Sequence, residues 1–326
     1  MALHGWLIID KPVGPGSTQI VSAVKRALRE GGYPKVKVGH GGTLDPLASG
    51  VLPVALGEAT KLCGRTLDSD KEYEFTIRFG EETSTLDAEG EVVATSERRP
   101  TFAEVEAVLP RFTGEIEQVP PAYSALKVEG QRAYDLARAG ETVELKARLV
   151  RLHSLSLRHP SESWGPNGGG ADQGGLDPSF RWDDGRDEVT LAALVSKGTY
   201  IRSLARDIAR ALGTVGSVTM LRRTRAGPFG LSRAISLDKL GEAAMARQLE
   251  HTLLPLTAGL VDIPALPVTP DQAGALRQGR KLIGIAAAPG LHLATDADVA
   301  VALVELSQGE VRVVRGFNMM MSKEAT

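Results

Sequence analysis

The chain has very little cysteine and no long apolar run. Cys63 is the single cysteine among 326 residues, which excludes a disulfide framework and a metal site made of several thiolates. No stretch approaches the roughly 20 apolar residues of a membrane helix, and the N-terminus lacks a basic segment followed by an apolar one. We therefore expect a cytoplasmic protein with no membrane association.

Sequence motifs for nucleotide cofactors and metals are missing as well. The chain has no Gly-x-x-x-x-Gly-Lys-Ser/Thr, no Gly-x-Gly-x-x-Gly after a strand, no His-Glu-x-x-His and no Gly-x-Ser-x-Gly. The six histidines, among them His40, His153 and His251, lack the spacing of metal ligands. We expect neither a cofactor nor a metal.

Net charge is only −2, but the charges are unevenly distributed. Residues 197–233 hold eight Lys/Arg against one Asp (+7), residues 1–40 hold six against two acids (+4), and residues 81–117 hold three against ten (−7). If the two basic stretches meet in the fold, they form one positive face suited to a phosphate backbone. The alternative is two separately solvated surfaces, and charge alone does not decide between them.

Periodicity predicts strands and helices in a mixed order. Lys71–Phe79 and Glu188–Val195 read as strands, the first placing Tyr73 on one face with three other apolar side chains. Ser17 or Thr18 is expected to cap a helix, and a second helix follows the loop at 196–200. Length and an ordinary globular composition, 42% hydrophobic and 24% charged, leave room for two domains.

Two segments interrupt this pattern. Residues 160–185 are rich in glycine and polar residues, which predicts a flexible surface insertion without a core. Four prolines between 255 and 270 mark a boundary, and the strands predicted at 299–306 and 310–316 suggest a small, mostly β appendage beyond it.

The stretch Gly39–Gly50, Gly-His-Gly-Gly-Thr-Leu-Asp-Pro-Leu-Ala-Ser-Gly, is the most informative of the chain. Four glycines allow close approach of the backbone to a flat or bulky group, and Asp45 before Pro46 is biased toward a turn that projects its side chain. One interpretation is a ligand site built around Asp45. The other is an Asx turn, which is the commoner use of such an Asp-Pro pair.

Together with other motifs, this stretch resembles the TruB-type tRNA pseudouridine synthases. The further matching motifs are Asp10-Lys11-Pro12, Gly57-Glu58-Ala59-Thr60-Lys61, Asp68-Ser69-Asp70-Lys71-x-Tyr73, Tyr123-Ser124-Ala125-Leu126-Lys127 and Ser196-Lys197-Gly198-Thr199-Tyr200-Ile201-Arg202. The resemblance covers roughly residues 5–235, except for the Gly-rich insertion.

The resemblance implies an α+β fold with a mixed, largely antiparallel central sheet of the pseudouridine synthase type, flanked by helices. A catalytic domain would span residues 1–255, and a small PUA-like RNA-binding β domain would span 262–326. The activity implied is isomerisation of uridine 55 in the T arm of tRNA to pseudouridine, by a monomer that needs no protein partner.

The resemblance also assigns roles to individual residues. Asp45 is the expected catalytic carboxylate, Tyr73 the aromatic stacked on the flipped base, and Arg202 the ion-pair partner of Asp45. His40, Tyr200 and Leu221 are expected to contact the target nucleotide or its arm. Lys11 and Lys127 are expected near the phosphates or the catalytic loop.

These residue types suit the chemistry. A stacked uridine must be extruded at a cost of a few kcal/mol, and stacking on an aromatic ring returns about 1–3 kcal/mol. Moving the glycosidic bond from N1 to C5 needs an anionic group as nucleophile or base, and a neighbouring arginine keeps that group charged. The open alternatives are an RNA-binding or tRNA-folding module without catalysis, and a hydrolase that uses Asp45 with a water.

Overall fold

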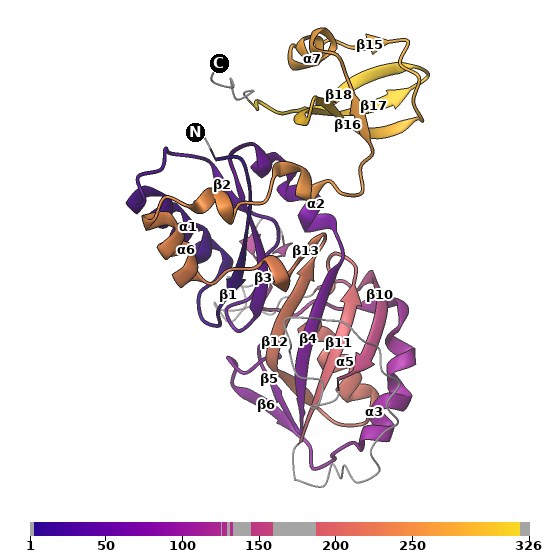
Figure 1. Cartoon of the computed structure of the whole chain (residues 1–326). Coiled ribbons are helices and arrows are strands. Elements are labelled where there is room, and N and C mark those ends of the chain that lie inside the picture. Colours follow the sequence, from indigo (N-terminus) through magenta and orange to yellow (C-terminus); the bar gives the residue numbers. More distant parts are fainter. Residues whose placement is uncertain (1–2, 125, 129–130, 133–144, 159–186, 320–326) are drawn as a thin grey trace, which may run out of the picture.

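The structure is a computed structural model that describes residues 3–124, 126–128, 131–132, 145–158 and 187–319. It contains a large mixed sheet with helices, and a smaller C-terminal β domain (Figure 1). The insertion predicted at 160–185 lies outside the described residues. Within the described ranges, no helix has both the length and the apolar character needed to span a membrane.

The large sheet has nine strands in the order β1-β3-β12-β4-β11-β10-β7, with β2 paired to β3 and β13 paired to β12. Its pairings are antiparallel except for β3 with β12, so the predicted mixed, largely antiparallel sheet is confirmed. The strands are β1 (Gly5–Lys11), β2 (Val38–His40), β3 (Ser49–Leu56), β4 (Lys71–Phe79), β7 (Gly114–Gln118), β10 (Arg148–Leu157), β11 (Glu188–Val195), β12 (Gly216–Ala226) and β13 (Phe229–Gly230).

Four helices share a core with one face of this sheet: α1 (Ser17–Glu30), α3 (Phe102–Val108), α5 (Ile201–Ala211) and α6 (Leu237–Met245). Strand β4 shows why the sheet packs this way, because Phe75, Ile77 and Phe79 alternate with more exposed residues and are buried on the helix side. Tyr73, one step earlier on that face, is partly buried at the edge of the core. The predicted one-sided alternation of β4 is confirmed.

The opposite face of β1 and β3 is covered as well. Trp6 and Ile8 alternate with Leu7 and Ile9, and they join a second core that includes Leu303 and other residues of the C-terminal β domain. Burial on both faces explains the continuous apolar run of β1. The segment between β3 and β4 forms a short 3₁₀ helix, η1 (Gly57–Leu62), followed by α2 (Cys63–Asp68).

The C-terminal β domain contains one helix and a five-stranded sheet in the order β14-β16-β17-β18-β15. Lys61 of η1 donates to the Gly316 carbonyl (2.9 Å), and Arg65 of α2 pairs with Asp262 (2.7 Å), so the two parts are joined by polar contacts too. The elements of the C-terminal β domain are β14 (Ala265–Pro267), α7 (Pro270–Arg277), β15 (Leu282–Ile283), β16 (Gly290–Asp296), β17 (Val299–Ser307) and β18 (Glu310–Gly316). The predicted small β appendage is confirmed.

Short hairpins complete the described structure: β5 (Glu81–Thr83) pairs with β6 (Val92–Thr95), and β8 (Lys127–Val128) pairs with β9 (Gln131–Arg132). One local prediction was wrong. Gly16, not Ser17 or Thr18, is the N-cap of α1, and its amide donates to the Gln19 side chain (2.6 Å). Ser17 is the first helical residue, and its hydroxyl binds elsewhere, as described below.

Candidate active site

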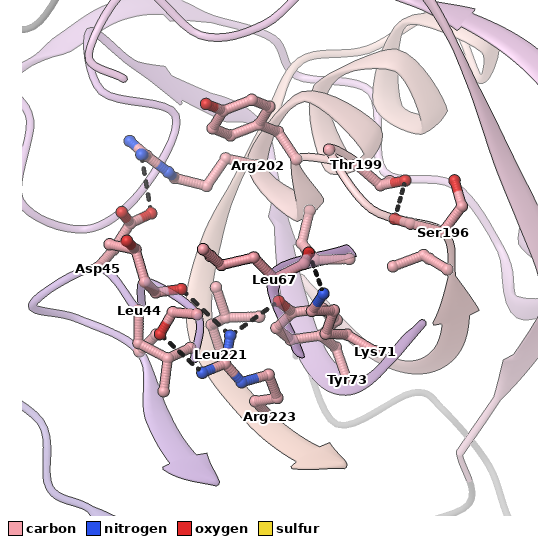
Figure 2. Close-up of a pocket in the computed structure, with 17 residues that line it drawn as sticks. Leu44, Asp45, Leu67, Lys71, Tyr73, Ser196, Thr199, Arg202, Leu221 and Arg223 are labelled. Atoms are coloured by element: carbon pink, nitrogen blue, oxygen red, sulfur yellow. Dashed lines mark hydrogen bonds and ion pairs between the residues drawn. The ribbon is translucent and has the colours of Figure 1, made fainter. Parts of the chain in front are cut away.

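A pocket of about 280 Å³ opens where the loop of residues 41–48 meets β4, β12 and the start of α5. It is lined by Asp45, Tyr73, Tyr200, Arg202 and Leu221, five of the predicted site residues. In Figure 2, Arg202 reaches Asp45 on one side of the pocket, and Arg223 lies between Leu44 and Tyr73 on another. Four residues that lie 28 to 176 positions after Asp45 in the sequence therefore converge with it on one cavity.

Asp45 and Arg202 form an ion pair with 2.8 Å between Oδ2 and Nη2. The Arg202 side chain is only 7% exposed, whereas that of Asp45 is 37% exposed and so reaches the pocket. Arg202 also donates to the carbonyls of Thr85 (2.8 Å) and Tyr123 (3.0 Å). The predicted contact between Asp45 and Arg202 is thus present, and the guanidinium is fixed from several sides.

Asp87 is a second carboxylate on Arg202 that sequence reasoning missed. Its Oδ2 lies 3.2 Å from Arg202 Nη1, and its side chain is 2% exposed. Its Oδ1 accepts from the Thr85 hydroxyl (2.5 Å) and from the amide of Glu89 (3.0 Å). A buried carboxylate with these partners holds the guanidinium in one orientation, which directs the other edge of Arg202 at Asp45.

Negative charge also gathers near this pair. The pKa of the Glu89 carboxyl is raised, first by desolvation and then by the carboxylates of Asp87 and Asp45. The local field therefore favours cationic partners for Asp45, and Arg202 supplies the closest one.

Tyr73 and Arg223 face each other across neighbouring strands, since Arg223 of β12 is paired with Tyr73 of β4. Arg223 is 1% exposed, and its guanidinium donates to the carbonyls of Val51 (2.8 Å), Thr43 (3.1 Å) and Gly42 (3.3 Å). It also lies 3.5 Å from the Tyr73 hydroxyl. Arg223 therefore ties the aromatic ring to the loop that carries Asp45.

The glycines of this loop serve the chain's own packing. A Cβ on Gly41 would lie 2.8 Å from Cβ of Thr66, and one on Gly50, whose φ is +100°, would lie 2.2 Å from the Arg223 carbonyl. We expected the glycines to admit an external flat group. Instead, the loop needs them to pass closely against α2 and β12.

Two further buried residues, Ser17 and Lys11, bind the backbone of the loop. The buried Ser17 hydroxyl accepts from the Leu44 amide (2.8 Å) and donates to the Leu44 carbonyl (3.1 Å), which fixes the residue before Asp45. Lys11 is fully buried, and its Nζ donates to the carbonyls of Pro12 (2.8 Å) and Pro46 (3.2 Å). Burial lowers the Lys11 pKa to about 8.

Lys11 therefore lies against the loop that carries Asp45, rather than at a surface open to phosphates. Lys71, which unlike Lys11 lines the pocket, is also surrounded by carbonyls: at the end of α2 its Nζ donates to those of Thr66, Leu67 and Ser69. Burial lowers the pKa of Lys71 to about 8 as well.

Tyr200 is positioned by a paired contact with the buried side chain of Gln118. The Gln118 amide accepts from the Tyr200 N–H (2.8 Å) and donates to its carbonyl (3.1 Å), while the Arg148 guanidinium lies 5.0 Å from the ring centroid. Such a cation–π contact favours one ring orientation. Leu221, 7% exposed, forms part of the apolar wall of the pocket.

Besides Lys11, two predicted contact residues are not in the pocket lining. His40, on β2, precedes the loop and is half-buried, and burial lowers its pKa. Lys127 lies in β8, and its side chain is outside what the structure describes. Their roles toward RNA remain predictions.

The basic stretch 197–233 is largely neutralised within the fold. Arg202 binds two carboxylates, Arg223 is buried among carbonyls, and five others pair with acids that come mostly from distant parts of the sequence. Those five pairs are Lys197–Asp68 (3.1 Å), Arg206–Asp207 (2.8 Å), Arg210–Glu82 (3.0 Å), Arg222–Asp10 (2.8 Å) and Arg225–Glu72 (3.3 Å). The excess of +7 along the sequence is therefore not a surface of free cations.

Comparisons with known proteins show the family of the chain. The profile of the TruB family pseudouridylate synthase N-terminal domain matches residues 29–201, and that of the tRNA pseudouridylate synthase B C-terminal domain matches residues 202–261. Proteins named tRNA pseudouridine synthase B are similar over nearly the whole length. The one from Novosphingobium aromaticivorans is 60% identical over 97% of this chain and 98% of its own, and that from Zymomonas mobilis is 58% identical over 97% of each.

Solved structures share the fold. A chain in the crystal structure of a Cbf5-Nop10-Gar1 complex is 25% identical, with a TM-score of 0.69 over 96% of this chain and 84% of that one. A chain in an H/ACA RNP bound to a substrate RNA containing 2′-deoxyuridine has a TM-score of 0.67 at 23% identity, over 96% of this chain and 85% of that one, which is a likeness of fold alone. By its sequence profile and its relatives, this chain belongs to the TruB family of pseudouridylate synthases.

Proposed function

We propose that this chain isomerises a uridine of tRNA to pseudouridine, and that the target is the uridine of the T arm at conventional position 55. The observation that carries the proposal is the partly exposed Asp45 carboxylate, ion-paired to the buried Arg202 at the edge of a pocket that also contains Tyr73. Membership of the TruB family supports the same reaction.

The pocket suits one everted base. Its volume of 280 Å³ is near the lower limit of small-ligand sites and too small for a stacked helix. Tyr73 offers a ring on which the base can stack, and Leu221 supplies an apolar contact. Stacking returns about 1–3 kcal/mol, which offsets most of the few kcal/mol that extrusion costs.

The reaction breaks the N1–C1′ bond and forms a C5–C1′ bond. The proton on C5 leaves and N1 gains one, so no electrons or outside groups are needed. Asp45 acts beside the sugar, as nucleophile or as base, while its ion pair with Arg202 orients the carboxylate. The Tyr73 hydroxyl, 3.5 Å from Arg223, is placed to move a proton at the end of the reaction.

We further propose that the chain works in the cytoplasm as a monomer, without a partner protein. Residues 1–255 would carry catalysis, and the β domain at 262–326 would act as a PUA-like RNA-binding module. These proposals predict that the purified chain alone modifies tRNA.

The test uses T-arm RNA labelled with tritium at C5 of its uridine. Release of tritium with the base retained is expected. Free uracil would indicate a hydrolase, and binding without release would indicate a binding or tRNA-folding module.

Asp45→Asn should abolish tritium release and leave RNA affinity within about tenfold of wild type, because the amide keeps the shape of the carboxylate but not its charge. Release by Asp45→Asn at the wild-type rate would overturn the proposed role of Asp45.

A further inference from the structure

Helix α1 has one outward face that becomes basic along its length. Its exposed residues Thr18, Ser22, Lys25, Arg26 and Arg29 recur at the spacing of a single helical face. The apolar positions of the helix face the core and are buried. The cations therefore have no part in packing α1 against the sheet.

These cations also lack the acids that neutralise the arginines of α5 and β12. Within the described residues, neither Lys25 nor Arg26 has a carboxylate within ion-pair distance. Arg29 is 4.0 Å from Glu30, and its side chain is 78% exposed, so that contact is weak. The positive charge of α1 remains available to a partner.

More cations follow the end of the helix in the chain or lie next to it. Lys35 and Lys37 are exposed in the segment that leads to β2. Arg247, just after α6, lies over Gly32, with Nη2 only 2.6 Å from where a Cβ on that glycine would be. We call Lys25, Arg26, Arg29, Lys35, Lys37 and Arg247 the α1 basic surface. Residues 17–40 contain five of these cations and a single acid, Glu30.

This surface is attached directly to the catalytic loop. At one end of the segment Ser17 holds Leu44, the neighbour of Asp45, and at the other end His40 leads into the same loop. An α-helix rises 1.5 Å per residue, so Lys25 and Arg26 lie roughly 12–14 Å along α1 from Ser17. An RNA strand with one base in the pocket extends over that distance within a few nucleotides.

We propose that the α1 basic surface binds the phosphate backbone of the T-arm stem whose uridine enters the pocket. The inference rests on the proposed function for the choice of RNA. Exposed lysine and arginine side chains contact phosphates without reading bases, so this contact positions the stem and tolerates changes in its sequence. Affinity should depend on salt in proportion to the phosphates contacted.

The test measures binding of a T-arm hairpin over a range of salt concentrations, in the Asp45→Asn background so that turnover does not interfere. Lys25→Gln/Arg26→Gln should weaken binding about tenfold or more and reduce the slope of log K against log[salt] by about one to two. The charge-retaining Lys25→Arg/Arg26→Lys should bind like the Asp45→Asn parent, which would separate charge from folding.

The control is Arg78→Gln/Arg111→Gln, which removes two exposed cations elsewhere. Arg78 is five residues along β4 from Tyr73, and it is paired with Glu188 (2.7 Å). A loss for the α1 variant no larger than for this control would overturn the proposal. Weaker binding of full-length tRNA with unchanged hairpin binding would overturn the placement on the T-arm stem. Because binding is measured without product, a wild-type chain that released no tritium would contradict the proposed function and not this inference.

Discussion

The two basic stretches of this protein differ in what surrounds their charges. In α5 and β12, Arg202 and Arg223 are almost fully buried, and their neighbours pair with acids from other elements. In α1, Lys25 and Arg26 are exposed and have no acidic partner among the described residues. The first stretch holds the site together, and we propose that the second holds the RNA.

The difference shows that charge summed along a sequence does not predict a surface. A buried guanidinium must be compensated by carboxylates or carbonyls, because the cost of an uncompensated buried charge is several kcal/mol. An exposed lysine has no such requirement. The stretch with the larger excess, +7 for residues 197–233, is therefore the one with less free charge.

The largest effect should come from replacing the central internal cation. Arg202→Lys is expected to lower the rate of tritium release by about 10²-fold or more, because one ammonium cannot reproduce the planar contacts to both Asp45 and Asp87. Single-turnover release from T-arm RNA measures it. Arg210→Lys, on the same helix and paired with Glu82 at the surface, is the control and should stay within about twofold.

Tyr73→Phe should have the next largest effect. It keeps the ring for stacking and removes the hydroxyl near Arg223, so the release rate should fall by about tenfold while hairpin affinity changes less. Rates and dissociation constants measured on the same RNA separate the two. Equal rates for Tyr73→Phe and wild type would remove the hydroxyl from the mechanism.

The lowered pKa of Lys71 should make the stability of the protein depend on pH. Because the folded pKa of Lys71 is lowered to about 8, the folded state binds fewer protons than the unfolded state between about pH 8 and 10.5. Its contribution to the free energy of unfolding should therefore rise with pH, by about 1–2 kcal/mol from pH 7 to 9.5.

Urea unfolding of wild type and Lys71→Met at both pH values gives this difference. Lys25→Met is the control for removing an ammonium from the surface. A stability difference between wild type and Lys71→Met that stays constant over this range would contradict the lowered pKa.

The smallest effect on the rate of tritium release is expected at Ser17. Ser17→Ala leaves the buried amide and carbonyl of Leu44 without partners, which should cost about 1–3 kcal/mol of unfolding free energy and a few-fold in rate. Ser22→Ala, at an exposed position on the same helix, should change stability by less than about 0.5 kcal/mol. Similar losses for the two variants would show that Ser17 does not fix the loop.

Local patterns predicted the regular parts of the fold well. The strands Lys71–Phe79 and Glu188–Val195 have the predicted bounds. Apolar and polar residues that alternate over eight or nine positions fit a strand and do not fit a helix. Gly213 ends α5 with φ +74°, as expected of a glycine after a helix. The spacing of Thr101 and Glu104 predicts a capping box, and this box is present at the start of α3.

No strand was predicted for β12, although it lies at the centre of the sheet. Its register shifts between Val218 and Met220 and again between Arg223 and Arg225, so the alternation of a regular strand is interrupted. Burial of Arg223 depends on carbonyls from another strand and a distant loop, which no local pattern shows.

The site was predictable to the extent that its residues stand in long motifs. Asp45, Tyr73 and Arg202 are found in such motifs and line one pocket. The sequence Asp87-Ala88-Glu89-Gly90 predicts only a turn, because the contact of Asp87 with Arg202 forms across 115 positions of sequence. A carboxylate that becomes buried only when distant segments pack together cannot be recognised from the sequence around it, which here indicates only a turn.

The most direct measurement is the position of the target base in a complex of this chain with T-arm RNA. We expect the uridine to be everted into the pocket, with its ring against Tyr73 and its sugar beside the carboxylate of Asp45, while Arg202 keeps its contact with that carboxylate. A uridine that stays stacked within the RNA loop, or a base held away from Asp45, would contradict the proposed mechanism.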